Sequence, residues 1–393
     1  MQLSKPLTLI ENANLYDPKA LGVKSVLIGG GTILAISDVN LHLPSELDVD
    51  IVDFSGKTLT PGFIDCHAHI TGGGGEAGFS SRVPPVPPSN FSAAGVTTVI
   101  GLLGTDDLSR TTAELVSTVY ALREQGLSAY CWTGGYHLPL TTLTGSARSD
   151  IAFIEPVIGI GEFAISDHRS SQPQFEEIVR LASEAHVAGL MTGKAGIIHF
   201  HLGDGDRKLD LIERAVAETE IPSRVFHPTH VNRNKPLFER ACKLLASGCY
   251  IDLTAFPEGA IEPGLSAAQA LSAIHEGGLP LDQVTVSSDG GGCMPLFSEQ
   301  GELTHMDFGR ADTLPETLRN ALKSGLSLEQ VLPVFTSNVA TLLRLKQKGR
   351  ISVGCDADLI ALNAEHQITD VMAMGQWHRY DNKRILKGLF EPE

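Results

Sequence analysis

The spacing of apolar and polar positions changes character near residue 60. From Leu7 to about Thr60, short apolar runs such as LTLIENANLYD, KSVLIGGGTILAI and VDIVDFSGKTL are separated by turn residues. Runs of this length rich in Val, Ile and Leu and bounded by Gly, Asp and Pro are typical of β-strands. The pattern predicts a small β unit without helices.

Beyond residue 62, strand-like runs alternate with amphipathic helical segments such as TTAELVSTVYALREQG, QFEEIVRLASEAHVAG and PLFERACKLLASG. Eight runs have the length and composition of buried strands: residues 62–70, 96–104, 127–135, 156–165, 196–204, 223–231, 249–256 and 283–290. Eight consecutive βα units predict an α/β fold, a (β/α)8 TIM barrel, with its chemistry at the C-terminal ends of the strands.

The end of the chain returns to short β runs after a helical tail over residues 315–345. The runs ISVGCDADLIAL and ITDVMAMGQWH predict strands that join those of the first 60 residues. We therefore expect a small β-sandwich-like domain built from both chain ends, residues 1–60 and 347–393, around a metal-dependent barrel over residues 61–346.

Composition and charge exclude several classes of function. The chain has 393 residues, 42% of them hydrophobic, and a formal net charge of −16 without a basic stripe. Nucleic acid and anionic membrane surfaces are therefore not expected as partners, and no apolar run reaches the length of a membrane span. The six cysteines include no C-x-x-C pair, which favours reduced thiols and a cytoplasmic protein.

Metal-ligating residue types recur at the predicted strand ends. His67 and His69 are two residues apart, so both side chains point to one face of a strand. Later strands add His201, Asp289 and a glutamate inside an apolar run, Glu162; His230 completes the set. Alone, each has an ordinary explanation, such as a hydrogen-bonded core histidine or a helix cap. Together, four imidazoles and two carboxylates at one barrel mouth match the ligands of a two-zinc site.

Several longer motifs carry a resemblance to a known family. In order they are PGFIDCHAHI, GGGGEAG, GLLGTD, CWTGGYH, AISDHRS, PTHVNRN, SSDG and GRISVGCDADLIAL. The chain resembles the amidohydrolase superfamily over essentially its whole length and, within it, the isoaspartyl (β-aspartyl) dipeptidases. The resemblance implies a metallo-dipeptidase that hydrolyses isoaspartyl dipeptides by attack of a metal-bridging hydroxide.

The resemblance also implies roles for individual residues. His67, His69 and Asp289 would hold one zinc, and His201 with His230 the other. Asp289 would take the proton of the bridging water and pass it to the leaving amine. Tyr136 would donate to the developing oxyanion, although an aromatic at this place is also compatible with an interface role.

Substrate recognition is expected at both ends of a dipeptide. Glu76, in the glycine-rich loop, would pair with the α-ammonium, while the amides of that loop, including Gly74, and Thr105 would hold the aspartyl α-carboxylate. Arg169 and Arg233 would each fork onto the C-terminal carboxylate. A flexible turn and ordinary surface salt bridges are the competing readings of these segments.

Two positions depart from the family pattern. Better-known members have a carboxylated lysine bridging the metals where this chain has Glu162, and a serine where it has Cys293. A glutamate preserves the charge of the site but is shorter by roughly 3.5 Å. We expect Gly159 and Gly161 to let the fourth strand shift inward, so that Glu162 bridges two Zn²⁺ directly. Cys293 is expected to line the substrate pocket as a thiol.

The sequence leaves two rival functions open. One is another binuclear amidohydrolase, either a cyclic amide hydrolase or an N-acyl amino acid deacylase. The other is a catalytically inactive amidohydrolase-like scaffold, which would be expected to lose metal ligands. The family further implies a homo-oligomer, with an octamer as one candidate assembly.

Overall fold

The small sheet brings together strands from both ends of the chain. The computed structural model describes residues 6–39, 41–257, 264–297 and 303–391. The sheet has nine strands: β1 (Leu7–Asp17), β2 (Lys19–Gly29), β3 (Thr32–Ser37), β4 (Val49–Asp53), β5 (Thr58–Pro61), β16 (Leu359–Leu362), β17 (Ile368–Ala373), β18 (Gln376–Tyr380) and β19 (Lys383–Arg384). The strand order is β19-β18-β17-β16-β5-β1-β2-β3, with β4 beside β1.

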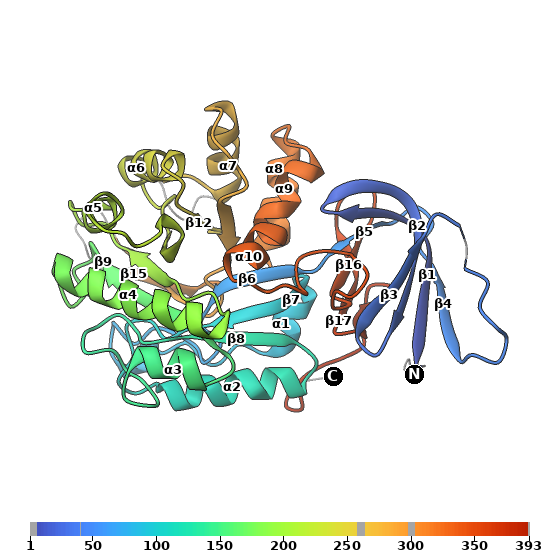
Figure 1. The fold of residues 1–393 in the computed structure, drawn as a ribbon, viewed down its shortest axis with the longest axis horizontal. Helices are drawn as coiled ribbons and strands as arrows, with labels where there is room; N and C mark the ends of the chain where they lie inside the picture. Colours follow the sequence, from blue (N-terminus) through green and yellow to red (C-terminus); the bar gives the residue numbers. More distant parts are fainter. Residues whose placement is uncertain (1–5, 40, 258–263, 298–302, 392–393) are drawn as a thin grey trace.

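The two chain ends join where β5 pairs antiparallel with β16, in the register Leu59 to Ala361. A separate apolar core lies inside this sheet, where Phe54 packs on Trp377 with ring centroids 5.9 Å apart. Figure 1 shows the sheet as a lobe beside the larger helical part of the molecule. The small sheet therefore has its own hydrophobic core, as a second folding unit requires.

The larger part is TIM-barrel-like. Six strands form one curled parallel sheet: β6 (Phe63–Ala68), β7 (Val96–Gly101), β8 (Ser128–Thr133), β9 (Val157–Ile165), β10 (Ile198–Leu202) and β11 (Phe226–Thr229). Two more, β12 (Ile251–Thr254) and β13 (Val284–Ser287), form a parallel pair. Every residue of these eight strands is buried except Tyr130, which explains why they appear in the sequence as continuous apolar runs.

Helices cover the outside of these strands (Figure 1). They are α1 (Pro88–Ala93), α2 (Thr112–Glu124), α3 (Ala147–Phe153), α4 (Phe175–Thr192), α5 (Asp210–Glu218), α6 (Lys235–Ala246), α7 (Ala267–Glu276), α8 (Thr313–Lys323), α9 (Leu328–Phe335) and α10 (Ser337–Leu342), with single turns at Phe79–Ser81 and Ser223–Val225. The ends of α4 follow local rules, because a capping box of Gln174 and Glu177 begins it and left-handed Gly193 ends it. Within the described residues, no helix is both long and apolar enough to cross a membrane.

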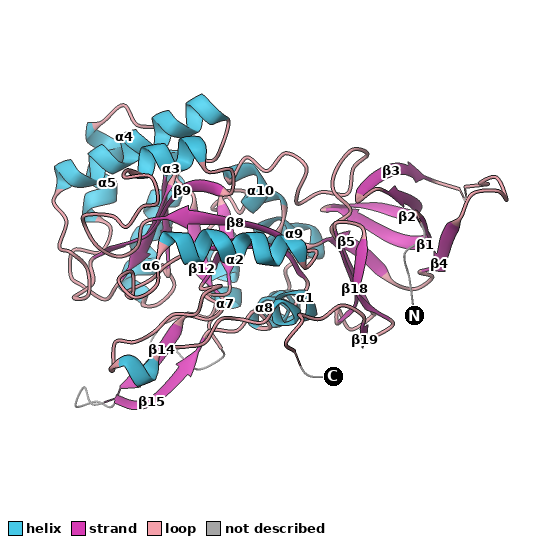
Figure 2. Cartoon of the chain, turned by 90° about the horizontal axis from the view of Figure 1, so that it is seen from below, coloured by secondary structure: helices cyan, strands magenta, loops and turns pink. Residues whose placement is uncertain are grey.

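Two features differ from the sequence-based expectation. Residues 328–345 read as one helical segment, but the structure divides them into α9 and α10 at Thr336, whose φ of −133° and ψ of −91° are not helical. The hairpin of β14 (Cys293–Phe297) and β15 (Leu303–Phe308) was not predicted, and Figure 2 shows it projecting from the barrel. Its register places Cys293 opposite Phe308, next to the strand end that carries Asp289.

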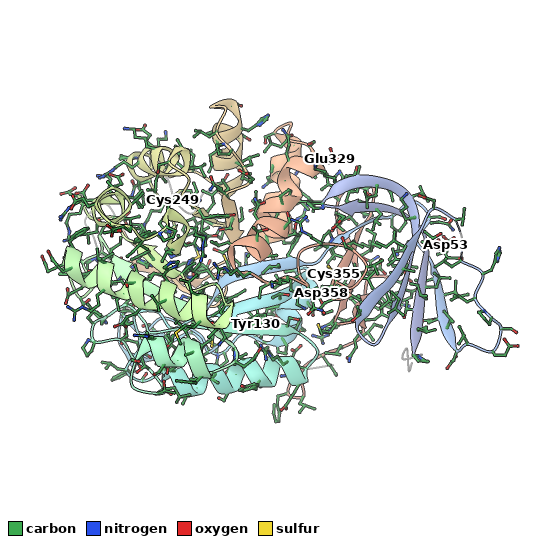
Figure 3. The ribbon with its side chains drawn as sticks, in the orientation of Figure 1. Asp53, Tyr130, Cys249, Glu329, Cys355 and Asp358 are labelled. Carbon is green, nitrogen blue, oxygen red and sulfur yellow. The ribbon has the colours of Figure 1, made fainter. Side chains whose placement is uncertain are left out.

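The barrel and the small sheet are joined by polar contacts, of which those of Lys348 are buried. Lys348 Nζ lies 2.6 Å from Asp358 Oδ2 and 2.8 Å from Asp356 Oδ2, and donates to the hydroxyl of Ser128 on β8. Ala20 N on β2 donates to Glu329 Oε1 on α9 over 2.7 Å. Figure 3 shows Asp358 beside the barrel and Glu329 near the end of β2.

Candidate active site

The metal-ligand candidates gather at the C-terminal ends of the barrel strands. His67 lies in β6 and His69 just beyond it, Glu162 in β9 and His201 in β10. His230 and Asp289 follow β11 and β13, and both have left-handed backbone conformations, with φ of 59° and 53°. All six side chains are buried. Parallel strands that end at one mouth therefore place these six residues together, as the sequence predicted.

His67, His69 and Asp289 form one group. Asp289 Oδ1 lies 3.3 Å from His67 Nε2 and 3.2 Å from His69 Nε2. The backbone sets this geometry, because Asp289 N donates to the carbonyl of His67 over 3.1 Å and His69 N donates to the carbonyl of Gly290 over 2.7 Å. The ligand atoms of the three side chains lie within 4.8 Å of one another, a separation that a single metal ion can span.

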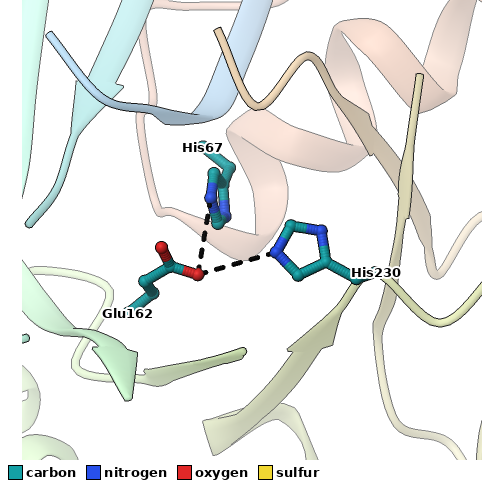
Figure 4. A group of neighbouring side chains, drawn as sticks. All are labelled: His67, Glu162 and His230. Carbon is teal, nitrogen blue, oxygen red and sulfur yellow. Dashed lines mark ion pairs between the residues drawn. The ribbon is translucent and has the colours of Figure 1, made fainter. Parts of the chain in front are cut away.

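Glu162 extends between this group and the remaining histidines. Its Oε1 lies 3.3 Å from His69 Nε2, while its Oε2 lies 3.0 Å from His201 Nδ1 and 3.6 Å from His230 Nε2. Oε2 is also 3.6 Å from His67 Nε2, and Figure 4 shows this oxygen between the rings of His67 and His230. One carboxylate thus faces imidazoles from three other strands, a position suited to contact two cations.

Glycines let β9 approach its neighbours closely enough for this reach. A Cβ at Gly159 would lie 2.6 Å from the carbonyl of Ile197, and one at Gly161 would lie 2.9 Å from the Cβ of His199. The pairing of β9 with β10 is irregular here, since Ile160 pairs with Ile198 but Phe163 with Phe200. The strand therefore bulges at Gly161 and Glu162, which is how a β-strand redirects a side chain.

His201 and His230 differ in their partners. His230 Nδ1 lies 2.7 Å from the hydroxyl of Thr254, which leaves its Nε2 facing Glu162. His201 contacts Tyr136 Oη and Glu162 through Nδ1, at 2.8 and 3.0 Å, and its Nε2 lies 3.0 Å from Asp167 Oδ2. His67, Glu162 and His230 form a second group with ligand atoms within 4.8 Å of one another, and His201 lies beside these two groups.

The charges of the site are strongly coupled. Burial by itself lowers the pKa of His69, but Asp289 and Glu162 outweigh it and raise that pKa to about 10. Burial opposes ionisation of Glu162, yet His67 and His201 hold the pKa of its carboxyl well below the usual range. His67 and His69 hold the pKa of Asp289 low in the same way, against burial. The carboxylates are therefore anionic and demand a compensating positive charge.

The donor set fits a divalent metal. Among the described residues, His67 Nε2 and Asp289 Oδ1, which face each other, are buried side-chain atoms without a hydrogen bond of acceptable geometry. Buried polar atoms without partners are costly, of order 1–3 kcal/mol each, and in native proteins mark a bound ion or water. Imidazole nitrogens with carboxylate oxygens are ligands that Zn²⁺ accepts.

The predicted recognition residues on one side of the site contact each other. Tyr136 is buried, and the guanidinium carbon of Arg169 lies 5.6 Å from the centre of its ring. Arg169 is paired with Asp167 over 2.8 Å and with Glu76 over 3.2 Å, and Thr105 donates to Glu76 over 3.1 Å. The structure thus brings Glu76, Thr105 and Arg169 into one charged cluster at the mouth of the site.

The other three recognition candidates occupy different surroundings. Arg233 forks onto Asp204, with nitrogen to oxygen distances of 3.1 and 2.8 Å, and donates to the carbonyl of Leu202. Gly74 has a φ of 75°, and a Cβ there would lie 3.3 Å from the Cβ of Cys293. Burial, together with the charges of Glu76 and Asp289, raises the pKa of the Cys293 thiol to about 12, so it is neutral. Arg233, like Arg169, therefore already has a carboxylate partner within the protein.

Sequence reasoning missed two residues in contact with the site. Asp167 accepts hydrogen bonds from Arg169 and contacts His201, and its pKa is held low by these partners despite burial. His199 lies 2.8 Å from His67 through Nδ1 of the latter. The sequence HFH at residues 199–201 carries a signal for His199, because His199 and His201 repeat the spacing of His67 and His69 on a second strand.

The comparisons with known proteins agree with this geometry. The model of the amidohydrolase family matches residues 58–378. A crystal structure of beta-aspartyl dipeptidase from Fervidobacterium islandicum AW-1, in complex with a beta-Asp-Leu dipeptide, is 38% identical over 99% of this chain and 100% of its own, with a TM-score of 0.93.

More distant relatives share the fold with other chemistries. A dihydroorotase from Lactiplantibacillus plantarum is 25% identical over 92% of this chain and 90% of its own. A dihydropyrimidinase structure from Brevibacillus agri is 17% identical over 97% and 96% of the two chains, with a TM-score of 0.66, which supports the fold alone. The family match and the full-length likeness together show that this chain belongs to the amidohydrolase family.

Proposed function

We propose that this protein is a zinc-dependent dipeptidase that hydrolyses isoaspartyl dipeptides. The observation that carries the proposal is the full-length likeness, at 38% identity, to a beta-aspartyl dipeptidase crystallised with beta-Asp-Leu. The chain also retains at its strand ends every residue proposed as a ligand: His67, His69, Glu162, His201, His230 and Asp289. This retention argues against an inactive scaffold.

Two metal positions are proposed. His67, His69 and Asp289 would hold one ion and His201 with His230 the other, with Glu162 between them in the place of a carboxylated lysine. When bound, the two ions supply an acidified water as nucleophile and polarise the scissile carbonyl. Zinc is favoured because the donor set consists of imidazoles and carboxylates.

Protein groups would handle the protons and the developing charge. Asp289 is anionic, because His67 and His69 hold its pKa low, and it would accept a proton from the nucleophile and pass it to the leaving amine. Tyr136 keeps its proton, because burial and the neighbouring Glu162 raise the pKa of its phenol well above the ordinary value. A protonated phenol in this position can donate a hydrogen bond to an oxyanion.

The charged cluster at the mouth suits a zwitterionic substrate. In the described structure Glu76 and Arg169 pair with each other, at 3.2 Å. A dipeptide would exchange this pair for contacts of its ammonium with Glu76 and of its carboxylate with Arg169, while Thr105 and the amide of Gly74 hold the second carboxylate. Arg233 would approach the C-terminal carboxylate after giving up part of its contact with Asp204. Cys293 would line the same pocket.

The proposal is tested by substrate choice together with metal content. We expect purified protein with about two zinc ions per chain to hydrolyse β-Asp-Leu and to leave α-Asp-Leu intact, because the two isomers place the scissile bond differently relative to the α-carboxylate. Equal rates on the two dipeptides, or fewer than one metal ion per chain, would contradict the proposal.

A cyclic-amide hydrolase is the second candidate. It is favoured by the likeness to dihydroorotase over 92% of this chain. An N-acyl amino acid deacylase, which also acts on an amide, is a further form of this alternative. Hydrolysis of dihydroorotate or of an N-acyl amino acid, with no turnover of β-Asp-Leu, would establish this alternative in place of the dipeptidase.

We further propose how the barrel closes, how the chain divides into domains and in which setting the protein acts. The barrel is proposed to close as a complete (β/α)8 unit over residues 61–346, supported by the hydrogen bonds that join the end of β13 to β6. Residues 1–60 and 347–393 would form one β-sandwich-like domain.

The six cysteines are free, which fits a reducing compartment such as the cytoplasm. A homo-oligomer, with an octamer as one candidate, is proposed from the family resemblance.

A further inference from the structure

Beneath the metal-ligand cluster, a chain of hydrogen-bonded side chains crosses the barrel interior. His67 Nδ1 lies 2.8 Å from His199 Nε2, and His199 Nδ1 lies 2.9 Å from His227 Nδ1. His227 Nε2 lies 3.0 Å from the hydroxyl of Thr285, which donates to Asp252 Oδ1 over 2.5 Å. The five residues come from β6, β10, β11, β13 and β12, and all are fully buried.

The direction of these hydrogen bonds is set at Asp252, where the series ends. Asp252 accepts hydroxyl hydrogen bonds from Thr285, from Thr229 over 2.6 Å and from Ser287 over 2.5 Å. Distances of 2.5–2.7 Å are typical of a hydroxyl that donates to an ionised carboxylate. A threonine hydroxyl has a single hydrogen, so Thr285 can only accept from His227 Nε2.

Each neutral imidazole carries one proton, so the direction passes from ring to ring. If His227 Nε2 carries the proton, His227 Nδ1 must accept, and His199 Nδ1 must donate to it. His199 Nε2 then accepts from the Nδ1 proton of His67. In a neutral His67 the Nε2 then keeps its lone pair, and this is the atom that faces Glu162 and Asp289.

Geometry supports the neutrality of the two middle rings, His199 and His227. Their hydrogen-bond partners are other imidazoles and the hydroxyl of Thr285, and no carboxylate of the described residues contacts either ring. Trp132 stacks on His199, with centroids 5.5 Å apart and planes 16° from parallel, which holds that ring in place. Because both rings are fully buried, a cationic form of either would be an unpaired buried charge, which is costly.

We propose that Asp252, Thr285, His227 and His199 form a tautomer relay that positions the lone pair of His67 Nε2 for metal binding. These four are positioning residues, because they act on the metal through His67. Second-shell partners that fix the tautomer of a ligating histidine are a general device, and their loss weakens metal affinity by about 10- to 100-fold. Here the hydrogen bonds run through the imidazoles of His67, His199 and His227 and the hydroxyl of Thr285 to the carboxylate of Asp252.

The most specific test reverses the direction of the hydrogen bonds and keeps a hydrogen-bonding side chain at every position of the relay. In Asp252→Asn the amide nitrogen can donate to Thr285, whose hydroxyl then donates to His227 Nε2. We expect ¹⁵N NMR of the full-length, metal-stripped chain to show His227 protonated at Nε2 in the wild type and at Nδ1 in the variant, with His199 moving from Nδ1 to Nε2. A His227 that carries its proton at Nδ1 in the wild type would overturn the relay.

Metal affinity supplies the second readout. By chelator competition, we expect Asp252→Asn and Thr285→Val to bind zinc about 10- to 100-fold more weakly, while Thr285→Ser, which keeps the hydroxyl, binds like the wild type. Asp370→Asn is the matched control, because Asp370 is a buried carboxylate of the small sheet with three hydrogen-bond donors of its own. Affinities of both relay variants within twofold of the wild type would overturn the inference.

This second readout rests on the proposed metal dependence, and the two ideas fail separately. A wild-type chain that binds no zinc contradicts the proposed function, whereas the tautomers of His199 and His227 are measured without metal. If Asp252→Asn does not fold, Thr285→Val and Thr285→Ser still compare a broken relay with an intact one at a single position.

Discussion

At the scale of single residues, Glu162 is the most informative side chain. It is a fully buried acid in a strand that is otherwise apolar, with imidazoles of His67, His69, His201 and His230 around its two oxygens. A carboxylate in such a place is stabilised only by positive charge, and the imidazoles or bound cations provide it. Its proposed role as a metal bridge makes it the first target for substitution.

We predict that Glu162→Gln loses most of its bound zinc and most of its activity. The amide keeps the shape of the side chain but removes the charge that two cations require. Metal content by elemental analysis, with rates on β-Asp-Leu, checks this expectation. Glu220→Gln, at an exposed position on the surface, is the control. If Glu162→Gln kept two metals and full activity, Glu162 would have no bridging role.

Tyr136→Phe tests the oxyanion donor. We expect kcat to fall by about 100- to 1000-fold with KM and zinc content little changed, because the lost hydrogen bond forms only in the transition state. Tyr120→Phe, a half-exposed tyrosine on α2, controls for the loss of a phenolic hydroxyl. A fall in zinc content as large as the fall in rate would instead assign Tyr136 to the positioning of His201, which its hydroxyl contacts at 2.8 Å.

At the scale of elements, β9 shows why local sequence rules were only partly sufficient. The glycines on either side of Ile160 were visible in the sequence as signs of a bulge or close approach. The partners of that approach, the ring of Trp132 and the backbone of residues 197–199, come from β8 and β10. The bulge is therefore a property of three adjacent strands, and no single one of them specifies it.

We predict that Gly161→Ala destabilises the protein by about 1–3 kcal/mol, the usual cost of overpacking, and lowers zinc affinity as well. The added methyl group would stand 2.9 Å from the Cβ of His199 and push apart the strands that carry Glu162 and His201. Chemical denaturation and chelator competition measure the two effects. Gly22→Ala serves as the comparison for zinc affinity, because its Cβ meets nothing within 4 Å, although its left-handed φ of 76° itself costs stability. Equal losses of zinc affinity in the two variants would contradict the packing explanation.

The β14–β15 hairpin and the break between α9 and α10 could not be predicted from local pattern. The hairpin begins at Cys293, where the sequence after SSDGGG has no strand-like alternation. The break at Thr336 occurs inside an apolar run that continues to satisfy helical periodicity. In both cases the intrinsic preference of the local sequence is weak, so it does not determine the conformation by itself.

At the scale of the whole molecule, buried contacts of Lys348 join the barrel and the small sheet. Lys348 precedes β16 and is buried among Asp356, Asp358 and Ser128. Burial by itself lowers the pKa of Lys348, but Asp358 and Asp356 outweigh it and raise that pKa, so the ammonium is charged. The joint between the two parts therefore depends on a buried charge network.

We predict that Lys348→Met destabilises the protein by about 3–5 kcal/mol, since removal of the cation leaves the carboxylates of Asp356 and Asp358 without their countercharge. Thermal and chemical unfolding measure the loss. Lys346→Met, at an exposed position two residues earlier, is the matched control. If both variants unfolded at the same denaturant concentration, the joint would contribute little to stability.

The sequence alone predicted the alternation of eight buried strands with helices and identified the six ligand candidates. It could do so because buried parallel strands are continuous apolar runs, and because polar residues at their ends stand out against them. The alternation of strand and helix then placed those polar residues at one mouth, before any contact between them was known.

How those residues face each other depends on the tertiary structure. It paired Arg169 with Glu76 and Arg233 with Asp204, set His201 between Tyr136 and Asp167, and connected His67 through two further histidines to Asp252. Each of these contacts joins residues from different strands or loops, separated by up to 185 positions between His67 and Asp252. Sequence spacing determines which face of a strand a side chain occupies, but the distance between atoms on different strands depends on barrel curvature, strand register and bulges.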